Sequence, residues 1–203
     1  SQNTQQYGVK KGIEIFGEEG VDAVLKELHQ LNDLEVVSAV HPSKMTREEV
    51  KRALPYLMFL KRKRSGLVKG RGCADGRSQR EFISKEEASS PTVSLYALIL
   101  TCLISAGEGR CTATVDLPGA FLQTMMPKDE DPVHVKIFGP MAELMIQEYP
   151  DLAEFAITTR KGTKIIYARA NKAIYGTLKA ALLFWQKLSS KLEEWGFEAN
   201  NYD

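Results

Sequence analysis

Asp116 is the residue best placed to bind a metal ion or a substrate. It follows Cys111-Thr-Ala-Thr-Val115, where β-branched residues favour a short strand, and it precedes Pro118-Gly119, a pair that turns the chain. A strand of residues 112–115 ending here would present the carboxylate where a cation or a substrate reaches it. Carboxylate oxygen is a preferred ligand of Mg²⁺. The alternative is that Asp116 only caps the turn.

Positive charge is concentrated in residues 51–80. Of the 27 Lys and Arg in the 203-residue chain, ten lie there, with Asp75 as the single acidic residue among them. Residues 56–63 alternate imperfectly between apolar and basic side chains, Ser65-Gly66 supplies a turn, and residues 67–73 return as a partner strand. The pattern predicts a basic hairpin suited to a polyphosphate or nucleic-acid partner. An ordinary solvated edge that carries Lys and Arg is the alternative.

Residues 88–107 carry no charge and predict an apolar helix, with Ser90 as N-cap, Pro91 in the first helical position and Gly107 at the end. The 20-residue length would suit a membrane span, but the Ser, Thr and Pro residues favour a buried core helix. One apolar face is expected to pack on the sheet that carries Asp116. Its residues are Leu95, Leu98, Ile99, Cys102, Leu103 and Ala106.

The remaining periodicities predict an α+β fold, with a mixed or antiparallel sheet and packed helices. Helices are expected over residues 18–31, from the capping box of Thr46 to before Pro55, over 140–149, and from 176 to 195 with Gly196 as the stop. The buried stripe of the last helix is predicted as Leu178, Ala181, Leu182, Trp185, Leu188 and Leu192. Strands are expected over residues 133–138, 157–160 and 165–169.

The amino-acid composition indicates the class of protein and the compartment in which it works. With 43% hydrophobic and 26% charged residues, the chain is typical of a soluble globular protein. Its three cysteines include no C-x-x-C pair and its three histidines are scattered, which favours a reducing intracellular compartment and gives no zinc site. The N-terminus shows no secretory signal pattern.

The Asp116 motif, continued by Ala120-Phe121-Leu122, resembles the first catalytic motif of Ty1/copia-type retrotransposon reverse transcriptases. Lys69 to Gly76, followed by Gln79, resembles that family's finger element Lys-Ala-Arg-Leu-Val-Ala-Lys-Gly and a later Gln, with departures at Gly72 and Asp75. Further resemblances follow in the family's order, over residues 69–203. They are the Ser90-Pro91-Thr92-Val93-Ser94 helix start, Val133-His134-Val135-Lys136, Lys172-Ala173-Ile174-Tyr175-Gly176, Gly196-Phe197 and Tyr202-Asp203.

The resemblance implies roles for individual residues. Asp116 would be a catalytic metal ligand, and Lys69 and Arg71 would contact the triphosphate of an incoming nucleotide. Phe121 would lie under the nucleotide's sugar and exclude a 2′-hydroxyl, although a plain core phenylalanine is the alternative. Lys179 stands where the family has a nucleotide- or template-contacting Gln, so only a phosphate contact is expected of it.

The implied activity is RNA-directed DNA synthesis with two Mg²⁺ ions. The family's other metal ligands come from a Tyr-x-Asp-Asp hairpin, and these 203 residues contain no adjacent pair of aspartates. We therefore expect the fingers and an incomplete palm of a right-hand polymerase, inactive by itself. Residues 1–50 would be an N-terminal helical extension, and residues 51–203 the reverse transcriptase portion.

The implied partners are an RNA or DNA template-primer, a deoxynucleoside triphosphate and the rest of the Pol polyprotein, with no membrane. The implied location is cytoplasmic, in virus-like particles, with access to the nucleus. The alternative function is a non-catalytic nucleic-acid-binding remnant that uses the basic hairpin at residues 51–80. A degenerate copy without function is a third reading.

Overall fold

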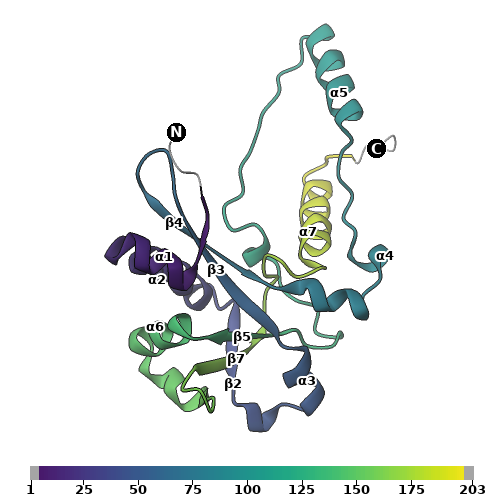
Figure 1. Cartoon of the computed structure of the whole chain (residues 1–203). Helices are drawn as coiled ribbons and strands as arrows, with labels where there is room; N and C mark the ends of the chain where they lie inside the picture. Colours follow the sequence, from purple (N-terminus) through teal and green to yellow (C-terminus); the bar gives the residue numbers. More distant parts are fainter. Residues whose placement is uncertain (1–4, 199–203) are drawn as a thin grey trace.

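The computed structural model describes residues 5–198. Within that part of the chain, seven strands form one sheet of mixed orientation in the order β1-β3-β5-β7-β2, with β4 beside β3 and β6 beside β7. The β3–β5 pair is parallel, whereas the β3–β4 and β5–β7 pairs are antiparallel. This mixed sheet with helices agrees with the α+β expectation (Figure 1).

The strands are β1 (Tyr7–Gly8), β2 (Val37–Val40), β3 (Leu54–Arg62), β4 (Val68–Ala74), β5 (His134–Phe138), β6 (Ala156–Thr158) and β7 (Lys164–Ala170). The α-helices are α1 (Val9–Phe16), α2 (Glu18–Asp33), α3 (Arg47–Arg52), α4 (Lys85–Ala88), α5 (Leu95–Gly107), α6 (Pro140–Glu148) and α7 (Ala180–Glu194). The 3-10 helices are η1 (Pro42–Lys44), η2 (Gly76–Glu81), η3 (Phe121–Gln123) and η4 (Pro150–Phe155).

The basic hairpin is present as β3 and β4, and its two faces differ. Alternate residues of β3 are buried, from Leu54 through Tyr56 and Met58 to Leu60, because side chains along a strand point to opposite faces. α1 and α2 lie against the hairpin (Figure 1), and Val24, Leu28 and Leu31 of α2 join the buried β3 residues in one core. Lys69 and Arg71 of β4 alternate with the buried Val68 and Gly70, and both are exposed on the opposite face of the hairpin.

Local capping explains where α3 begins. The Thr46 side chain accepts from the Glu49 backbone N–H at 3.2 Å, and the Glu49 carboxylate accepts from the Thr46 N–H at 2.7 Å. These reciprocal hydrogen bonds form the capping box that the sequence predicts. The helix ends before Pro55, as expected.

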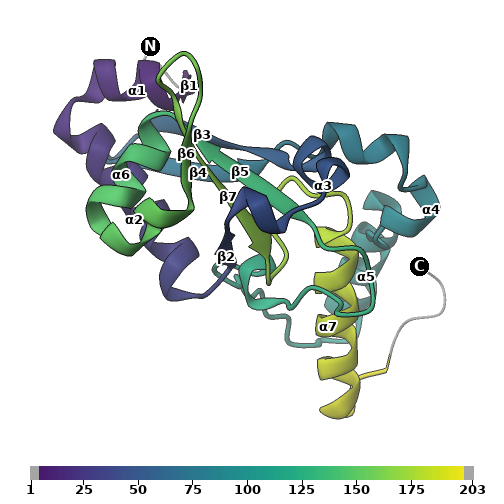
Figure 2. The same ribbon diagram turned by 90° about the horizontal axis from the view of Figure 1, so that it is seen from below.

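The first fifty residues contribute to the same sheet. β1 pairs with β3, and β2 pairs with β7 through residues Val37 to Val40. Figure 2 shows α1, α2 and α6 grouped at one end of the molecule, and α2 contacts both β4 and α6. The division at residue 50 stays a prediction.

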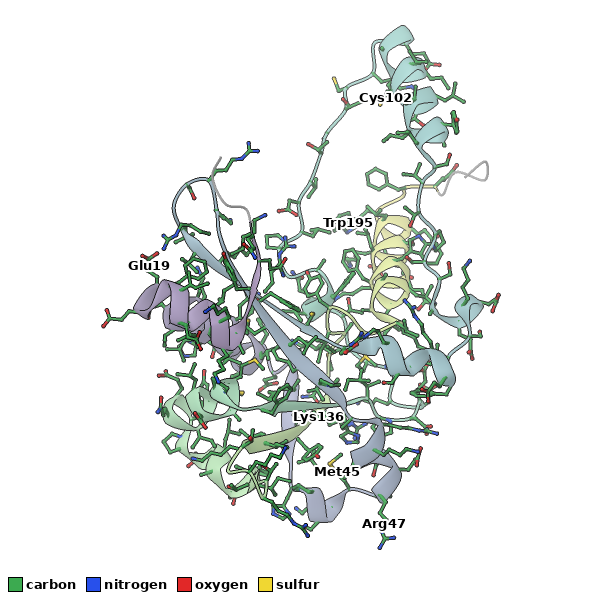
Figure 3. All side chains as sticks on the ribbon, viewed as in Figure 1. Glu19, Met45, Arg47, Cys102, Lys136 and Trp195 are labelled. Atoms are coloured by element: carbon green, nitrogen blue, oxygen red, sulfur yellow. The ribbon has the colours of Figure 1, made fainter. Side chains whose placement is uncertain are left out.

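The apolar helix differs from its prediction in start and in surroundings. α5 begins at Leu95 with Ser94 as N-cap, whose hydroxyl accepts from the Ala97 N–H at 3.1 Å, and not at Ser90-Pro91. Its apolar face does not pack on the sheet, because Leu95, Leu98 and Leu103 are 67%, 48% and 66% exposed. α5 projects from the rest of the chain (Figure 1), and Cys102 marks it in Figure 3, well away from Lys136 on the sheet.

The strand predicted at residues 112–115 is also wrong. Residues 110–117 have no regular structure, and Val115 is 81% exposed. Among the described residues no strand pairs with this segment, and an unpaired strand has no hydrogen-bonded ladder to hold it. The turn at Pro118-Gly119 is present and leads into η3.

The last helix, α7, begins four residues later than predicted and its stripe is only half-buried. Ala180 is the buried residue of the helix, and Trp185 is 40% exposed. Gly196 ends the helix as expected, with its N–H donating to the Glu193 carbonyl at 2.9 Å. Trp195 lies at that end (Figure 3), whereas Tyr202 and Asp203 lie outside the described residues.

Candidate functional site

A large groove, called here the central groove, is lined by residues of α2, of β4 and of the turn after Asp116. Its volume is about 1540 Å³. The lining residues with charged, titratable or aromatic side chains come from β4, α2, the hairpin tip and two loops. They are Lys69, Arg71 and Cys73 of β4, Glu19, Asp22, Lys26, Glu27, His29 and Asp33 of α2, Phe59 and Lys63 of the hairpin, Asp116 and Tyr175. Three residues singled out from the sequence, Asp116, Lys69 and Arg71, therefore line the same groove, although 45 positions separate Arg71 from Asp116.

Asp116 reaches the groove from an extended segment and not from a strand end. The residue is exposed, and its neighbours Leu117, Pro118 and Gly119 line the groove with it. A hydrogen bond within the segment stabilises the turn, because the Gln123 side-chain amide donates to the Pro118 carbonyl at 2.9 Å. The carboxylate is thus accessible to a cation or a ligand from the groove.

The β4 wall of the central groove is basic, whereas the α2 wall has four acidic residues against Lys26 and His29. On β4, Lys69 and Arg71 present an ammonium and a guanidinium, the donors that bind phosphate oxygens most strongly. On α2, Glu27 is engaged with the hairpin, since its carboxylate accepts from the Gly72 N–H at 3.2 Å. A polyanion would therefore be attracted to the β4 wall and repelled from the α2 wall.

Gly72, which departs from the family's finger element, has a structural reason in this chain. A Cβ atom at this position would lie 1.7 Å from the Tyr56 hydroxyl oxygen, closer than any two such atoms approach. Tyr56 is 2% exposed, and burial raises its phenol pKa far above the ordinary value. The large buried Tyr56 therefore requires glycine at position 72.

Asp75, the other departure, forms an ion pair. Its carboxylate accepts from the Arg77 guanidinium at 2.6 and 2.8 Å and from the Arg77 backbone N–H at 3.3 Å. The Arg77 side chain lowers the pKa of the Asp75 carboxyl, chiefly through these hydrogen bonds. Asp75 thereby caps η2 and does not line the central groove.

The end of β4 and η2 are joined directly to residues 172–178. The Ala74 N–H donates to the Tyr175 carbonyl at 2.7 Å, and the Gln79 side-chain carbonyl accepts from the Leu178 N–H at 3.0 Å. Gly176 has φ +91°, and a Cβ there would lie 2.1 Å from the Ala74 carbonyl oxygen. Two motifs a hundred residues apart are therefore held in backbone contact.

Phe121 and Tyr175 form a ring pair beside the groove. Their ring centroids are 4.6 Å apart at 35°, and the ring centroid of Phe184 on α7 lies 5.8 Å from that of Phe121. Tyr175 is 38% exposed and lines the central groove, whereas Phe121 is half-buried and lies outside its lining residues. The role of Tyr175 is not evident in the sequence, because its motif gives no indication of which side chain faces the groove.

Lys179 lies apart from the central groove and is engaged elsewhere. Its ammonium forms a 2.7 Å ion pair with Glu130, with the two side chains 23% and 41% exposed. Lys179 thereby connects the start of α7 to the charged loop at residues 128–131. The structure does not bring it together with Asp116, Lys69 and Arg71.

A second groove, the hairpin-tip groove, adjoins the central groove. It has a volume of about 570 Å³ and no acidic residue in its lining. The residues that line it are Gln6, Phe59, Lys61, Arg62, Lys63, Arg64, Ser65, Lys69 and Arg71. Arg62 is held by Glu19 at 2.9 Å and lies over the Phe16 ring at 5.2 Å. The remaining basic residues make this tip a strongly positive surface.

The fit to Mg²⁺ is partial. Within residues 5–198 no group of three or more His, Cys, Asp and Glu side chains could hold a metal ion. Asp116 offers one hard oxygen ligand, and magnesium in phosphate-transfer sites is commonly held by one or two carboxylates together with substrate phosphates. The described residues therefore fit one ligand position of such an ion and not a complete site.

No family model, no curated protein and no solved structure matches this chain. Across the described residues, none of the helices is both long and apolar enough to cross a membrane.

Proposed function

We propose that this chain is the fingers and first palm portion of a reverse transcriptase of the Ty1/copia type, which binds a deoxynucleoside triphosphate in the central groove. The observation that carries the proposal is that Asp116, Lys69 and Arg71 line one groove. The motif resemblance assigns these residues to metal and triphosphate binding. Their common position in a groove with one basic wall supports that assignment.

Each residue has a defined task in this proposal. Lys69 and Arg71 bind the triphosphate oxygens from the β4 wall, Arg71 with two parallel donors and Lys69 as a point charge. Asp116 holds a divalent cation on the opposite side of the triphosphate. That ion, when bound, supplies charge stabilisation for nucleotidyl transfer. Further ligands of that ion would come from the nucleotide's phosphates and from water.

Equilibrium binding tests the proposal. The purified chain is titrated with dTTP and Mg²⁺, and the variants are Lys69→Gln, Arg71→Gln and Asp116→Asn. Loss of a charge-assisted hydrogen bond is worth about 1.5–3 kcal/mol, so each basic variant should weaken binding roughly tenfold or more. Asp116→Asn should remove the part of the affinity that depends on Mg²⁺.

The matched control is Lys164→Gln, which removes an exposed lysine on β7 outside both grooves. It should leave dTTP affinity within about twofold, since a distant surface charge is screened beyond roughly 10 Å. Equal weakening by Lys164→Gln and Lys69→Gln would reduce the groove to a general charge effect and would contradict the proposal.

Catalysis by these 203 residues alone is not expected, because they contain no adjacent pair of aspartates. A primer-extension assay on an RNA template, with Mg²⁺ and all four deoxynucleotides, should yield no product. Extension above the level of an Asp116→Asn control would show that the site is complete in this chain.

The hairpin-tip groove favours a second candidate function, that of a non-catalytic nucleic-acid binder. Such a protein binds phosphates without nucleotide specificity, and its affinity falls steeply with salt. Single-stranded RNA should then bind with a steep salt dependence that Lys61→Gln and Lys63→Gln both reduce, while dTTP is no better a ligand than inorganic tripolyphosphate. A preference for dTTP would instead favour the polymerase portion.

A further inference from the structure

We infer that Tyr175 is the aromatic surface on which the nucleoside of the bound triphosphate packs, and that Phe121 supports it from behind. This inference rests on the proposed function and names the specificity-determining residue of the same groove. The resemblance to the reverse transcriptases directs attention to Phe121. In this chain it is Tyr175 that lines the central groove, 38% exposed, while Phe121 is half-buried and absent from the lining.

The Tyr175 ring is held firmly enough to serve as a platform. Phe121 packs against it with ring centroids 4.6 Å apart, and Phe121 in turn contacts Phe184 at a centroid distance of 5.8 Å. An aromatic pair of this kind contributes about 0.5–1.5 kcal/mol beyond its buried area. One side of the tyrosine is therefore occupied by Phe121, and the remaining exposed surface is offered to the groove.

The backbone around Tyr175 is fixed on both sides. Ala173 and Ile174, just before it, are fully buried, and the Tyr175 carbonyl accepts from the Ala74 N–H at 2.7 Å. After it, the Leu178 N–H donates to the Gln79 side chain, which is 3% exposed. A ring on such a backbone pays little conformational entropy when it packs on a ligand.

The position of Tyr175 along the groove suits a nucleoside. The Ala74–Tyr175 hydrogen bond places it at the end of β4, and Arg71 lies three residues back along that strand. At a rise of roughly 3.3 Å per residue this separates the two Cα positions on β4 by about 10 Å. The triphosphate would lie against Arg71 and Lys69, and the base and sugar would extend toward Tyr175.

The test compares a nucleotide with its phosphate chain alone. dTTP and inorganic tripolyphosphate, each with Mg²⁺, are titrated into the wild-type chain and into Tyr175→Ala, Tyr175→Phe and Phe121→Leu. Stacking of a base on an aromatic ring predicts that Tyr175→Ala weakens dTTP binding about tenfold and changes tripolyphosphate binding less than twofold. Tyr175→Phe keeps the ring and should keep dTTP affinity, and Phe121→Leu should have the smaller effect of a lost support.

A measurement on the wild-type chain tests the inference even if a variant fails to fold. In aromatic ¹H–¹³C spectra, dTTP should shift the Tyr175 ring signals, identified by their loss in Tyr175→Phe, and tripolyphosphate should leave them in place. Nucleoside-dependent shifts at Phe121 with none at Tyr175 would overturn the inference. So would a Tyr175→Ala variant that binds dTTP as tightly as wild type, or one that loses both ligands equally.

Failure of the proposed function would look different. If wild type binds dTTP no more tightly than tripolyphosphate, the groove is not a nucleotide site, and both the proposed function and this inference fall. If wild type prefers dTTP and that preference survives Tyr175→Ala, the inference alone falls.

Discussion

Gly72 shows how one residue of a hairpin depends on its buried neighbour. The position has no room for a methyl group, because the hydroxyl of Tyr56 occupies the space where Cβ would lie. The sequence shows only that Gly72 departs from the family's finger element. The structure relates that departure to Tyr56 on the neighbouring strand, so the two residues should be considered together.

Gly72→Ala should destabilise the chain by about 1–3 kcal/mol, the usual cost of forcing additional atoms into a packed core. Urea unfolding measures the change. The matched control is Gly107→Ala at the end of α5, where no atom lies within 4 Å of the added Cβ. That variant should be neutral or more stable by up to about 1 kcal/mol, since alanine favours helix over glycine. Equal losses in both variants would show that the clash with Tyr56 is absent.

Gln79 is the residue of η2 that connects this 3-10 helix to the loop after Tyr175. Its side-chain carbonyl is the partner of the Leu178 N–H, and it is 3% exposed. Gln79→Leu leaves that donor without a partner in a buried place, at a cost of about 1–3 kcal/mol. Amide exchange at Leu178 should become faster, and unfolding should shift to lower urea.

The control for Gln79 is Arg80→Ala, an exposed neighbour on the same 3-10 helix η2. It should leave exchange at Leu178 unchanged. Unaltered Leu178 exchange in Gln79→Leu would show that the hydrogen bond does not hold the loop.

Local sequence patterns predict single helices and strands. They do not predict which other elements each helix or strand packs against. The α2 helix and the basic hairpin could be predicted because their hydrophobic periods and turn residues lie within each segment. The strand at residues 112–115 could not, because a strand needs a neighbour and none is paired with it among the described residues. The apolar face of α5 likewise predicts that the helix is buried, but it does not predict which element would cover that face.

The candidate site follows the same rule. The spacing of the local sequence draws attention to Asp116, and the resemblance to the reverse transcriptases singles out Lys69 and Arg71 among the basic residues of the hairpin. Their approach to one groove depends on the packing of β4, α2 and the turn, which no local pattern contains. Nor does any pattern distinguish Tyr175 from Phe121 as the ring that faces the groove.

Protonation of His134 on β5 makes the stability of the folded chain depend on pH. Burial lowers the pKa of its imidazole below the ordinary 6.5, and the nearby Arg169 adds to this while Glu49 opposes it. The unfolded chain therefore binds the proton more tightly than the folded chain does. The stability contributed by neutral His134 is complete above about pH 6.5 and is lost as the pH falls through the lower folded value.

Unfolding by urea at pH 7.5 and 5.5 measures this effect. The free energy of unfolding should fall between the two pH values, and His134→Gln should show a smaller fall because the titrating group is gone. A fall of the same size in both proteins would assign the pH dependence to other groups.

Among the described residues of the whole molecule, α5 and the segment after α7 carry large apolar side chains that are exposed. Leu95, Leu100 and Leu103 of α5 are each more than half exposed, and Trp195 and Phe197 beyond α7 are 66% and 61% exposed. Large apolar side chains that are exposed to this degree contribute little buried area to the folded chain. Figure 1 shows α5 projecting beyond the end of α7, away from the sheet.

Leu103→Ser should therefore change the free energy of unfolding by no more than about 0.5 kcal/mol, the usual range for a surface substitution. Leu28→Ala in α2, where Leu28 is 1% exposed, should cost about 2–5 kcal/mol. Urea unfolding of both variants gives the comparison. A loss of several kcal/mol in Leu103→Ser would mean that α5 is packed in solution.

The most direct test of the central claim is to locate the divalent ion that accompanies a bound nucleotide. Mn²⁺ replaces Mg²⁺ with dTTP, and its paramagnetic broadening is recorded residue by residue in ¹H–¹⁵N spectra of the chain. The account predicts that signals around Asp116 and from Lys69 to Cys73 are broadened. In Asp116→Asn the broadening around position 116 should disappear. Broadening confined to the hairpin tip at residues 61–65, or unchanged by Asp116→Asn, would contradict it.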